Sequence, residues 1–560
     1  MFNIKSLMIT ALAWGSFATG KRHSAKQPTD PLLDGIEALG GIDRLRSVSA
    51  VTYIGNTVYR TRTLMEAYSV LGVDNMMSPA GSQNISFSYD QPHIKQRIDR
   101  FHEAGEMFLL ARPGLDPFKY SLVLQGGKEG YAAVVEGTMN LFEPDAPPGG
   151  YLDGLLAAYL IYDAERMSPL LLSTIMSNKN YSTGLEDAGM GLKLPAVHDK
   201  TLDLTVLFDS DTKLPYIIRS YEDHGIYGKS TQDLLVYNYT SIDGIKFPGR
   251  FKTIYNKQHI LMDYQVDRVI VNPHLDPQFF DGPRGRQAAS YPARDSSYDF
   301  SEIGEWYSNY LWSGAYRGTL MNLSATTSLP GMPGVWFLNF PDGSGYQQVV
   351  VEFEKEVLVL DSPPHQSHLV LQWARETLGK AVTHVWPSHH HHDHALGLKD
   401  YVAAGAKAVV LDQAQDYYSN IPGIQFVTYS ADKPITFNDS HTQATIVHLQ
   451  GSAHAFDQAY AAIMPVCPTA NSTVAIFEAD YWNPHFANSD YFVDHVEAAE
   501  LLNKLSEDRA ARSSLIIPAH GVNTSLLNEL IDLTGLPYPS YLPTDFKHSA
   551  CTSAVNRSTA

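Results

Sequence analysis

Cysteine is nearly absent from this 560-residue chain, which contains only Cys467 and Cys551. Two cysteines permit one disulfide at most, and they exclude a disulfide-based scaffold or a zinc domain built from cysteine ligands. Charged residues are sparse at 18%, and 41 basic side chains face 60 acidic ones, which gives a formal net charge of −19. We therefore expect no nucleic-acid partner, because phosphate binding requires a basic surface.

Long apolar runs are also missing. The apolar stretch from Leu7 to Phe17 is shorter than the roughly 20 residues that cross a membrane. Lys5 precedes this stretch and small residues follow it, a pattern that predicts a secretory signal peptide over residues 1–20. The rest of the chain has neither a membrane-spanning run nor a lipid-anchor motif, so we expect a protein without a membrane anchor.

Acceptor sites for N-glycosylation exceed the number that composition predicts. Eight N-x-S/T sequons occur, against roughly three expected from the numbers of Asn, Ser and Thr. Together with the signal peptide, this excess predicts a secreted, extracellular and N-glycosylated protein. Clustering of these residue types in loops is the alternative explanation. The sequons begin at Asn84, Asn180, Asn238, Asn322, Asn438, Asn471, Asn523 and Asn556.

The first half of the chain has the pattern of an antiparallel β domain. Over residues 30–283, short alternating runs of apolar and polar residues are separated by turn signals. This spacing predicts a β-rich, half-barrel-like sheet around a helix from Tyr151 to about Ser173. We find no chemical motif in this domain.

The pattern changes in the second half. Residues 284–302 are rich in turn-forming and polar residues and are interpreted as a linker. Strands then alternate with helices over residues 303–540, which predicts an α/β layered domain. Residues 541–560 are polar and are expected to form a loosely held tail.

A run of histidines follows the buried strand predicted at Val382–Trp386. Its register H-x-H-x-D-H selects four candidate ligands: His389, His391, Asp393 and His394. Alternate side chains of an extended segment point the same way, so the first three can converge while the fourth turns toward a neighbouring site. Imidazoles and carboxylates are ligands of zinc and similar metals. The pattern therefore predicts a metal site, with a fortuitous polar loop as the alternative.

Three further metal-binding residue types stand just after predicted strands, in the same half of the chain. They are His454, Asp480 and His520. The carboxyl ends of strands are the edge at which open α/β sheets gather their sites. Singly, His454 and His520 are more simply explained as ordinary hydrogen-bonded histidines. Four strand-end placements in order favour a metal site instead.

These ordered motifs resemble the metallo-β-lactamase superfamily over about residues 300–535. The whole chain is similar to secreted two-domain members whose β-rich N-terminal domain is lipoprotein-like. The resemblance implies an αββα sandwich with two metal ions, usually Zn²⁺. Asp361 stands where the family has an early strand-end aspartate, whereas Ala455 and Ala479 replace a common threonine and glycine. The implied ligands are His389, His391 and His454 for one ion and Asp393, His394 and His520 for the other, with Asp480 as the bridge.

The resemblance also implies a hydrolase acting on a small-molecule substrate. A hydroxide bridging two metal ions would attack an ester, lactone or amide-type bond, with Asp393 as the catalytic residue that binds metal and orients the hydroxide. A phosphodiester or sulfate ester hydrolase, or a secondary-metabolite enzyme, is the alternative with the same fold. A non-catalytic protein that binds an apolar ligand is the alternative from another class. Tyr481, Trp482 and His485 either line the pocket or form its aromatic surroundings.

Overall fold

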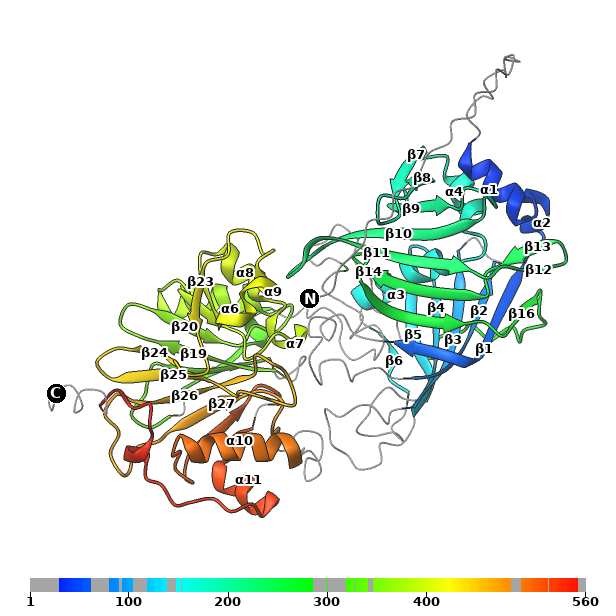
Figure 1. Cartoon of the computed structure of the whole chain (residues 1–560). Coiled ribbons are helices and arrows are strands. Elements are labelled where there is room, and N and C mark those ends of the chain that lie inside the picture. The colour runs from blue at the N-terminus through cyan, green and yellow to red at the C-terminus, as the bar shows by residue number, and fades with distance from the viewer. Residues whose placement is uncertain are drawn as a thin grey trace, which may run out of the picture.

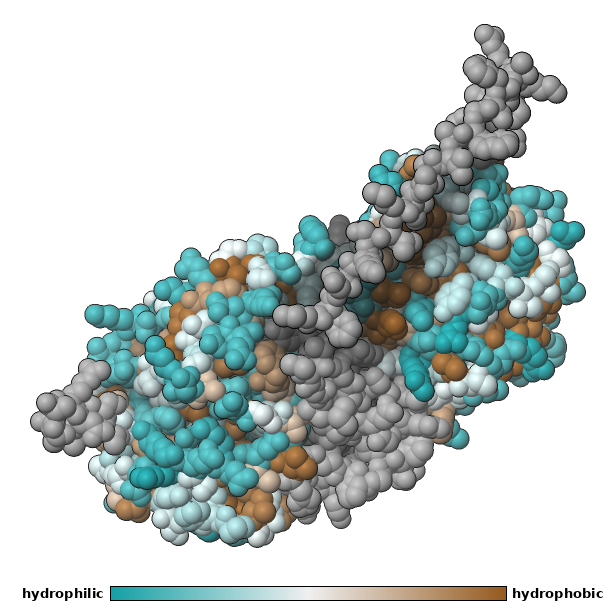
Figure 2. All heavy atoms as spheres, viewed as in Figure 1, coloured by the Kyte–Doolittle hydropathy of each residue, from teal (hydrophilic) through white to brown (hydrophobic). Residues whose placement is uncertain are grey.

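The computed structural model describes residues 30–61, 80–89, 93–103, 118–137, 148–152, 154–285, 300, 319–327, 329–340, 346–484, 495–521 and 523–551. The predicted signal peptide and most of the predicted linker lie outside these residues. Among the helices that are described, none has the length and apolar character needed to cross a membrane. Figure 2 shows hydrophilic residues spread over the visible face, with apolar residues in small groups between them.

The first half of the chain forms one large antiparallel sheet, and this confirms the predicted antiparallel β-rich domain. Its strand order is β6-β5-β4-β3-β2-β1-β15-β14-β11-β10-β9-β8-β7, and β16 also pairs with β1 (Figure 1). The strands are β1 (Ala50–Thr61), β2 (Ala80–Ser88), β3 (Lys95–Glu103), β4 (Phe118–Gln125), β5 (Tyr131–Gly137), β6 (Gly150–Tyr151), β7 (Tyr181–Asp187), β8 (Lys193–Asp199), β9 (Leu204–Phe208), β10 (Pro215–His224), β11 (Gly228–Tyr237), β14 (Arg250–Tyr255), β15 (His259–Gln265) and β16 (Arg268–Val271). A separate hairpin joins β12 (Thr240–Ile242) to β13 (Ile245–Phe247).

Helices pack against this sheet and close its core. The structure contains α1 (Pro31–Leu39), α2 (Ile42–Arg46), α3 (Gly154–Met167) and α4 (Leu171–Asn178). The single helix predicted from Tyr151 to about Ser173 is therefore two helices. Pro169 lies between α3 and α4, and proline interrupts a helix because it lacks an amide hydrogen and its ring clashes with the preceding turn. Leu155 and Ile161 of α3 belong to the same apolar core as Val51 and Phe87 of the sheet.

The second half contains two sheets that pack face to face. The first is β17 (Ser324–Thr326), β18 (Val335–Asn339), β19 (Gln347–Glu352), β20 (Val357–Leu360), β21 (His384–Trp386), β22 (Lys407–Leu411) and β23 (Phe426–Tyr429). The second is β24 (Ile435–Asn438), β25 (Thr442–His448), β26 (Ala459–Pro465), β27 (Ala475–Glu478), β28 (Leu515–Pro518) and β29 (Ser525–Leu526). Val349 and Val385 of the first sheet share one apolar core with Ile446 and Phe477 of the second.

Helices cover the outer faces of the two sheets (Figure 1). Trp373 and Tyr401, which lie on helices, belong to the core shared by both sheets. Leu501 and Leu530 pack instead with Tyr460 and Ile516 of the second sheet. The helices are η6 (Leu320–Asn322), α6 (Ser367–Trp373), its π-helical continuation η7 (Ala374–Leu378), α7 (His392–Ala395), α8 (Leu398–Ala403), η8 (Asp412–Ala414), α9 (Gln415–Tyr418), α10 (His495–Glu507), α11 (Leu527–Thr534) and η9 (Pro543–Asp545).

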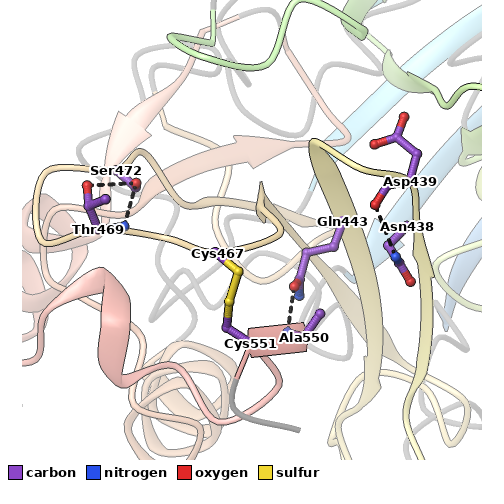
Figure 3. The surroundings of a disulfide bond; sticks show 8 residues. All are labelled: Asn438, Asp439, Gln443, Cys467, Thr469, Ser472, Ala550 and Cys551. Carbon is purple, nitrogen blue, oxygen red and sulfur yellow. Dashed lines mark hydrogen bonds between the residues drawn. A yellow bond between two sulfur atoms is a disulfide. The ribbon is translucent and has the colours of Figure 1, made fainter. Parts of the chain in front are cut away.

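The C-terminal segment up to Cys551 is held to the second sheet. A disulfide joins Cys551 to Cys467, and the amide of Ala550 donates a hydrogen bond of 2.7 Å to Gln443 Oε1 (Figure 3). Phe546 is buried in the core beneath α10 and α11. The expectation of a loosely held tail is therefore wrong for its described part, because a covalent bond and one buried aromatic ring outweigh the polar composition around them.

Removing this disulfide should destabilise the second domain. The two cysteines are 84 positions apart, so the bond closes a long loop and reduces the entropy of the unfolded chain. We expect Cys467→Ser combined with Cys551→Ser to lower the free energy of unfolding by about 2–4 kcal/mol, measured by denaturant titration. Reductant should destabilise the wild-type protein similarly and leave the double variant unchanged. An equal response of both proteins would contradict this.

Stability of the first domain should decline between mildly acidic and neutral pH. Burial raises the pKa of Glu165, in α3, from 4.5 to about 7. The folded protein then holds a proton that the unfolded chain has released, so stability falls as the pH rises through this interval. Glu165→Gln should therefore be more stable than wild type above pH 7, by up to about 3 kcal/mol, and equally stable below the unfolded pKa.

Melting temperatures measured from pH 4 to pH 8 check this prediction. Glu129→Gln is the matched control, because Glu129 lies on an exposed turn of the same domain. A difference between wild type and Glu165→Gln that did not vary with pH would argue against it.

Candidate metal centre

Four strand ends meet at one edge of the two packed sheets. β20 runs parallel to β21, and β27 runs parallel to β28, so each pair ends on the same side. Asp361 follows β20, the histidine run follows β21, Asp480 follows β27 and His520 follows β28. The connection between β25 and β26 adds His454. Strand register thus brings together residues that lie far apart in the sequence.

The seven predicted ligands fall into two neighbouring groups. In each group, one potential ligand atom per residue lies within 4.8 Å of the others. The first group is His389, His391 and His454, and the second is Asp393, His394, Asp480 and His520. The grouping agrees with the predicted division of the ligands between two ions. Metal binding by these residues stays a prediction.

The carboxylate of Asp480, a member of the second group, also lies close to the first. Its Oδ2 atom is 3.4 Å from His389 Nε2 and 3.3 Å from His454 Nε2, in the first group. The same oxygen is 2.9 Å from His394 Nε2, and Oδ1 is 2.9 Å from His520 Nε2, in the second. Asp480 has a φ of 69°, a left-handed conformation that Asp and Asn tolerate better than most residues. The bend turns its side chain out of the strand direction toward both groups.

Asp393 does not lie where simple alternation places it. An extended segment would direct it to the same point as His389 and His391, but α7 begins at His392. The helical turn rotates Asp393 into the second group, where its Oδ2 is 3.4 Å from both His394 Nε2 and His520 Nε2. The strand-like interpretation is correct up to His391 and wrong for Asp393.

Acceptors on the outer side of the centre orient several of the imidazoles. His394 Nδ1 is 2.6 Å from Asp361 Oδ2, and His454 Nδ1 is 3.1 Å from Glu497 Oε1. His389 Nδ1 is 3.2 Å from Ser388 Oγ. Such partners hold the Nδ1 proton and leave Nε2 directed into the centre, as second-layer groups do for metal-binding histidines.

Asp361 can be identified from the sequence, whereas Glu497 cannot. Glu497 lies on α10 and is 1% exposed, although most helical glutamates are solvated. Glu500, one helical turn later, accepts hydrogen bonds from the amide of Ala453 at 3.0 and 3.2 Å. The (i, i+3) spacing of two acidic residues on an amphipathic helix was the available signal, but the same spacing is common on solvent-facing surfaces.

The histidines of the centre differ in the direction in which their surroundings shift the pKa. Burial, reinforced by three neighbouring imidazoles, lowers the pKa of His389 well below its usual value. Burial also opposes a charge on His454, but Glu497 and Asp480 outweigh it and raise its pKa to about 10. The carboxylates likewise raise the pKa of His520 to about 9 against the effect of burial. The centre thus holds several negative charges that protons compensate, and a divalent cation can replace those protons.

The residues present fit a pair of divalent metal ions. One group offers three imidazoles, and the other offers two imidazoles and two carboxylates, a donor set suited to zinc and similar borderline metals. His389 Nε2 is buried and makes no hydrogen bond, although an unsatisfied buried polar atom costs about 1–3 kcal/mol. A cation bound among these residues would give that nitrogen a partner.

The remaining candidates lie around the centre. His390 and His392 belong to neither group and are buried. Tyr481 is also buried, and its hydroxyl is 2.5 Å from Ser452 Oγ and donates to Glu500 at 3.2 Å. These contacts favour the interpretation of Tyr481 as aromatic surroundings. His485 lies outside the described residues.

The comparison with protein-family profiles agrees with the sequence motifs. Residues 342–441 match the sequence profile of the metallo-beta-lactamase superfamily. A solved metallo-beta-lactamase from Pontibacter korlensis is 14% identical, with 38% of this chain and 98% of that chain covered and a TM-score of 0.30. One from Hirschia baltica is 16% identical, with coverages of 39% and 99% and a TM-score of 0.28. No curated protein matches the chain. The match to the metallo-beta-lactamase superfamily thus lies within the second domain and covers residues 342–441 of it.

Proposed function

We propose that the second domain is a hydrolase that uses two zinc ions to cleave an ester, lactone or amide-type bond of a small molecule. One observation carries this proposal: the Asp480 carboxylate, whose side chain is 10% exposed, lies within 3.4 Å of histidine nitrogens from both ligand groups. A purely structural zinc site needs four ligands in one closed shell. Seven ligands divided around a shared carboxylate favour a dinuclear site with positions left for substrate.

The chemistry of such a site divides between the metals and the protein. Two bound ions would supply a Lewis acid for the substrate oxygen and would lower the pKa of a water toward about 7. Burial opposes the charge of Asp393, but His394 and His520 hold its pKa well below the usual range. Asp393 is therefore ionised at neutral pH, and we propose that its carboxylate accepts a hydrogen bond from the attacking water and orients it. Asp361 and Glu497 keep two of the imidazoles in position.

Phosphodiester or sulfate ester hydrolysis is the second candidate within the same fold. The same ligand groups are compatible with either reaction. A net charge of −19 weakly disfavours a strongly anionic substrate, because the summed field of the protein repels it. We therefore rank it after hydrolysis of a neutral or weakly charged molecule.

The alternative of an apolar-ligand protein is less well supported. A cavity lies between α3 and the sheet of the first domain, and its lining includes Arg100, Asp163, Gln83 and Gln96 beside apolar residues such as Leu122. Covering ionised groups with an apolar molecule removes their water without replacing its hydrogen bonds, which costs several kcal/mol. The lining suits water or a polar molecule better than an apolar ligand.

The metal content and the hydrolytic activity of the Asp480→Asn variant test the hydrolase proposal. Asparagine keeps the shape of aspartate and tolerates the positive φ, so the variant removes the charge with little backbone strain. We expect about two zinc ions per wild-type chain by elemental analysis and at most one in the variant. The kcat/KM for p-nitrophenyl acetate or a simple lactone should fall at least about 100-fold.

Asp532→Asn, on the exposed face of α11, is the matched control and should change neither quantity. Faster turnover of bis(p-nitrophenyl) phosphate than of any ester or lactone would favour the second candidate. Absence of metal from the wild-type protein after zinc is supplied, or turnover that survives chelation, would refute the proposal.

We also propose that the protein is exported and N-glycosylated. The asparagines of five sequons are exposed: Asn180, Asn238, Asn438, Asn471 and Asn523. A disulfide between Cys467 and Cys551 is the kind of bond that oxidising compartments maintain. Expression in a eukaryotic secretory host should give protein in the medium whose mass falls after enzymatic deglycosylation. Recovery only inside the cells, or an unchanged mass, would exclude this.

A further inference from the structure

A hairpin of the first domain reaches into the core of the second. β10 and β11 pair antiparallel up to His224 and Gly228, and the hairpin extends toward α8 and α9 (Figure 1). Ile226, in the turn between the strands, is 0% exposed. Its neighbours in the apolar core are residues of the second domain, including Leu396 and Tyr417. The tip of the turn is therefore buried inside the second domain and does not lie on its surface.

The turn is shaped for close approach to the segment that follows the histidine run. A Cβ added at Gly225 would lie 3.1 Å from Lys399 Cδ and 3.3 Å from the carbonyl oxygen of Leu396. His224 Nδ1 accepts hydrogen bonds from the amides of Ile226 and Tyr227, both at 3.1 Å. These two bonds close the turn locally.

Two rings of the hairpin contact His392. The ring centroid of His224 is 5.0 Å from that of His392, and the ring of Tyr227 is 6.0 Å away. Tyr227 also packs edge-on against Tyr417 of α9, at 5.6 Å between centroids. His392 lies between the predicted ligands His391 and Asp393. Contacts to its ring therefore restrain the backbone that carries those predicted ligands.

One hydroxyl links the hairpin to both non-ligand histidines of the run. Tyr417 Oη accepts from Tyr227 Oη at 3.3 Å and lies 3.1 Å from His392 Nε2. It donates to the carbonyl oxygen of His390 at 3.3 Å. A phenol has one donor and two acceptor positions. With Nε2 of His392 as the donor, these three bonds use the full capacity of the hydroxyl.

We propose that the β10–β11 hairpin is a positioning element of the candidate metal centre. By contacting His392 directly and His390 through Tyr417, it fixes the segment from the end of β21 through the short helix α7, which presents His389, His391, Asp393 and His394. Partners outside the ligand shell contribute about 10–100-fold to metal affinity in other sites, and a segment without regular hydrogen bonds depends on them most. The proposal rests on the proposed function, in that these residues bind metal.

Undocking the turn should weaken metal binding without removing a ligand. Ile226→Glu places a charge in the apolar core, and Tyr227→Phe removes one hydroxyl while keeping the ring. We expect zinc affinity, measured by chelator competition on the full chain, to fall about 10–100-fold for Ile226→Glu and less for Tyr227→Phe. The visible spectrum of the Co²⁺-loaded protein should change, and kcat should fall more than KM rises.

Met190→Glu is the matched control, because Met190 is a fully exposed apolar residue at the tip of the β7–β8 hairpin of the same sheet. It should change none of these quantities. Unaltered zinc affinity and Co²⁺ spectrum in both Ile226→Glu and Tyr227→Phe would overturn the proposal.

Hydrogen exchange of residues 389–394 in metal-free protein separates this proposal from the proposed function. Faster exchange in Ile226→Glu than in Met190→Glu is expected even if the wild-type protein binds no metal. Identical exchange in the two variants would overturn the positioning role, whereas a metal-free wild type with faster exchange in Ile226→Glu would refute only the hydrolase.

Discussion

The rest of the centre depends on the largely desolvated carboxylate of Asp480, whose side chain is 10% exposed, and on its contacts with histidines. Four histidine nitrogens from three separate loops lie within 3.4 Å of its two oxygens. A buried carboxylate is tolerated only when positive charge or hydrogen bonds surround it. Positive charge on the surrounding imidazoles then requires further acceptors on their outer side, and Asp361 and Glu497 are those acceptors. The imidazoles thus lie between Asp480 on one side and Asp361 and Glu497 on the other, and this arrangement follows from the desolvation of one charge.

Strand topology makes this convergence possible. Parallel pairing of β20 with β21 and of β27 with β28 places four strand ends on one edge. Positive φ values at Asp361 and Asp480, 70° and 69°, turn the two carboxylates out of their strands toward that edge. The strands beneath are fully buried, so close packing of the two sheets limits how far the edge can deform.

Features that depend on local residue patterns could be predicted from the sequence. Features that depend on contacts between distant segments could not. Alternation along strands indicated the antiparallel first domain, and strand-end placement selected all seven residues that the structure groups. Periodicity could not show that α7 begins at His392 and redirects Asp393. Burial of Glu497, Phe546 and Ile226 was equally hidden, because an acidic helix residue, an aromatic in a polar tail and an apolar turn residue are each common on surfaces. Their burial arises from contacts with distant parts of the chain.

The histidines of the run have two roles, and this explains why His390 and His392 are also histidines. His389 and His391 belong to the first ligand group and His394 to the second, while His390 and His392 belong to neither. His390 Nδ1 is 2.7 Å from Asp457 Oδ1, which holds the run to the connection between β25 and β26, and His392 contacts the hairpin of the first domain. An imidazole on the outward side fills space and supplies a hydrogen-bonding nitrogen to a buried acceptor, which an aliphatic side chain cannot do. On the proposed positioning role, the predicted ligands depend on contacts from both domains for their geometry.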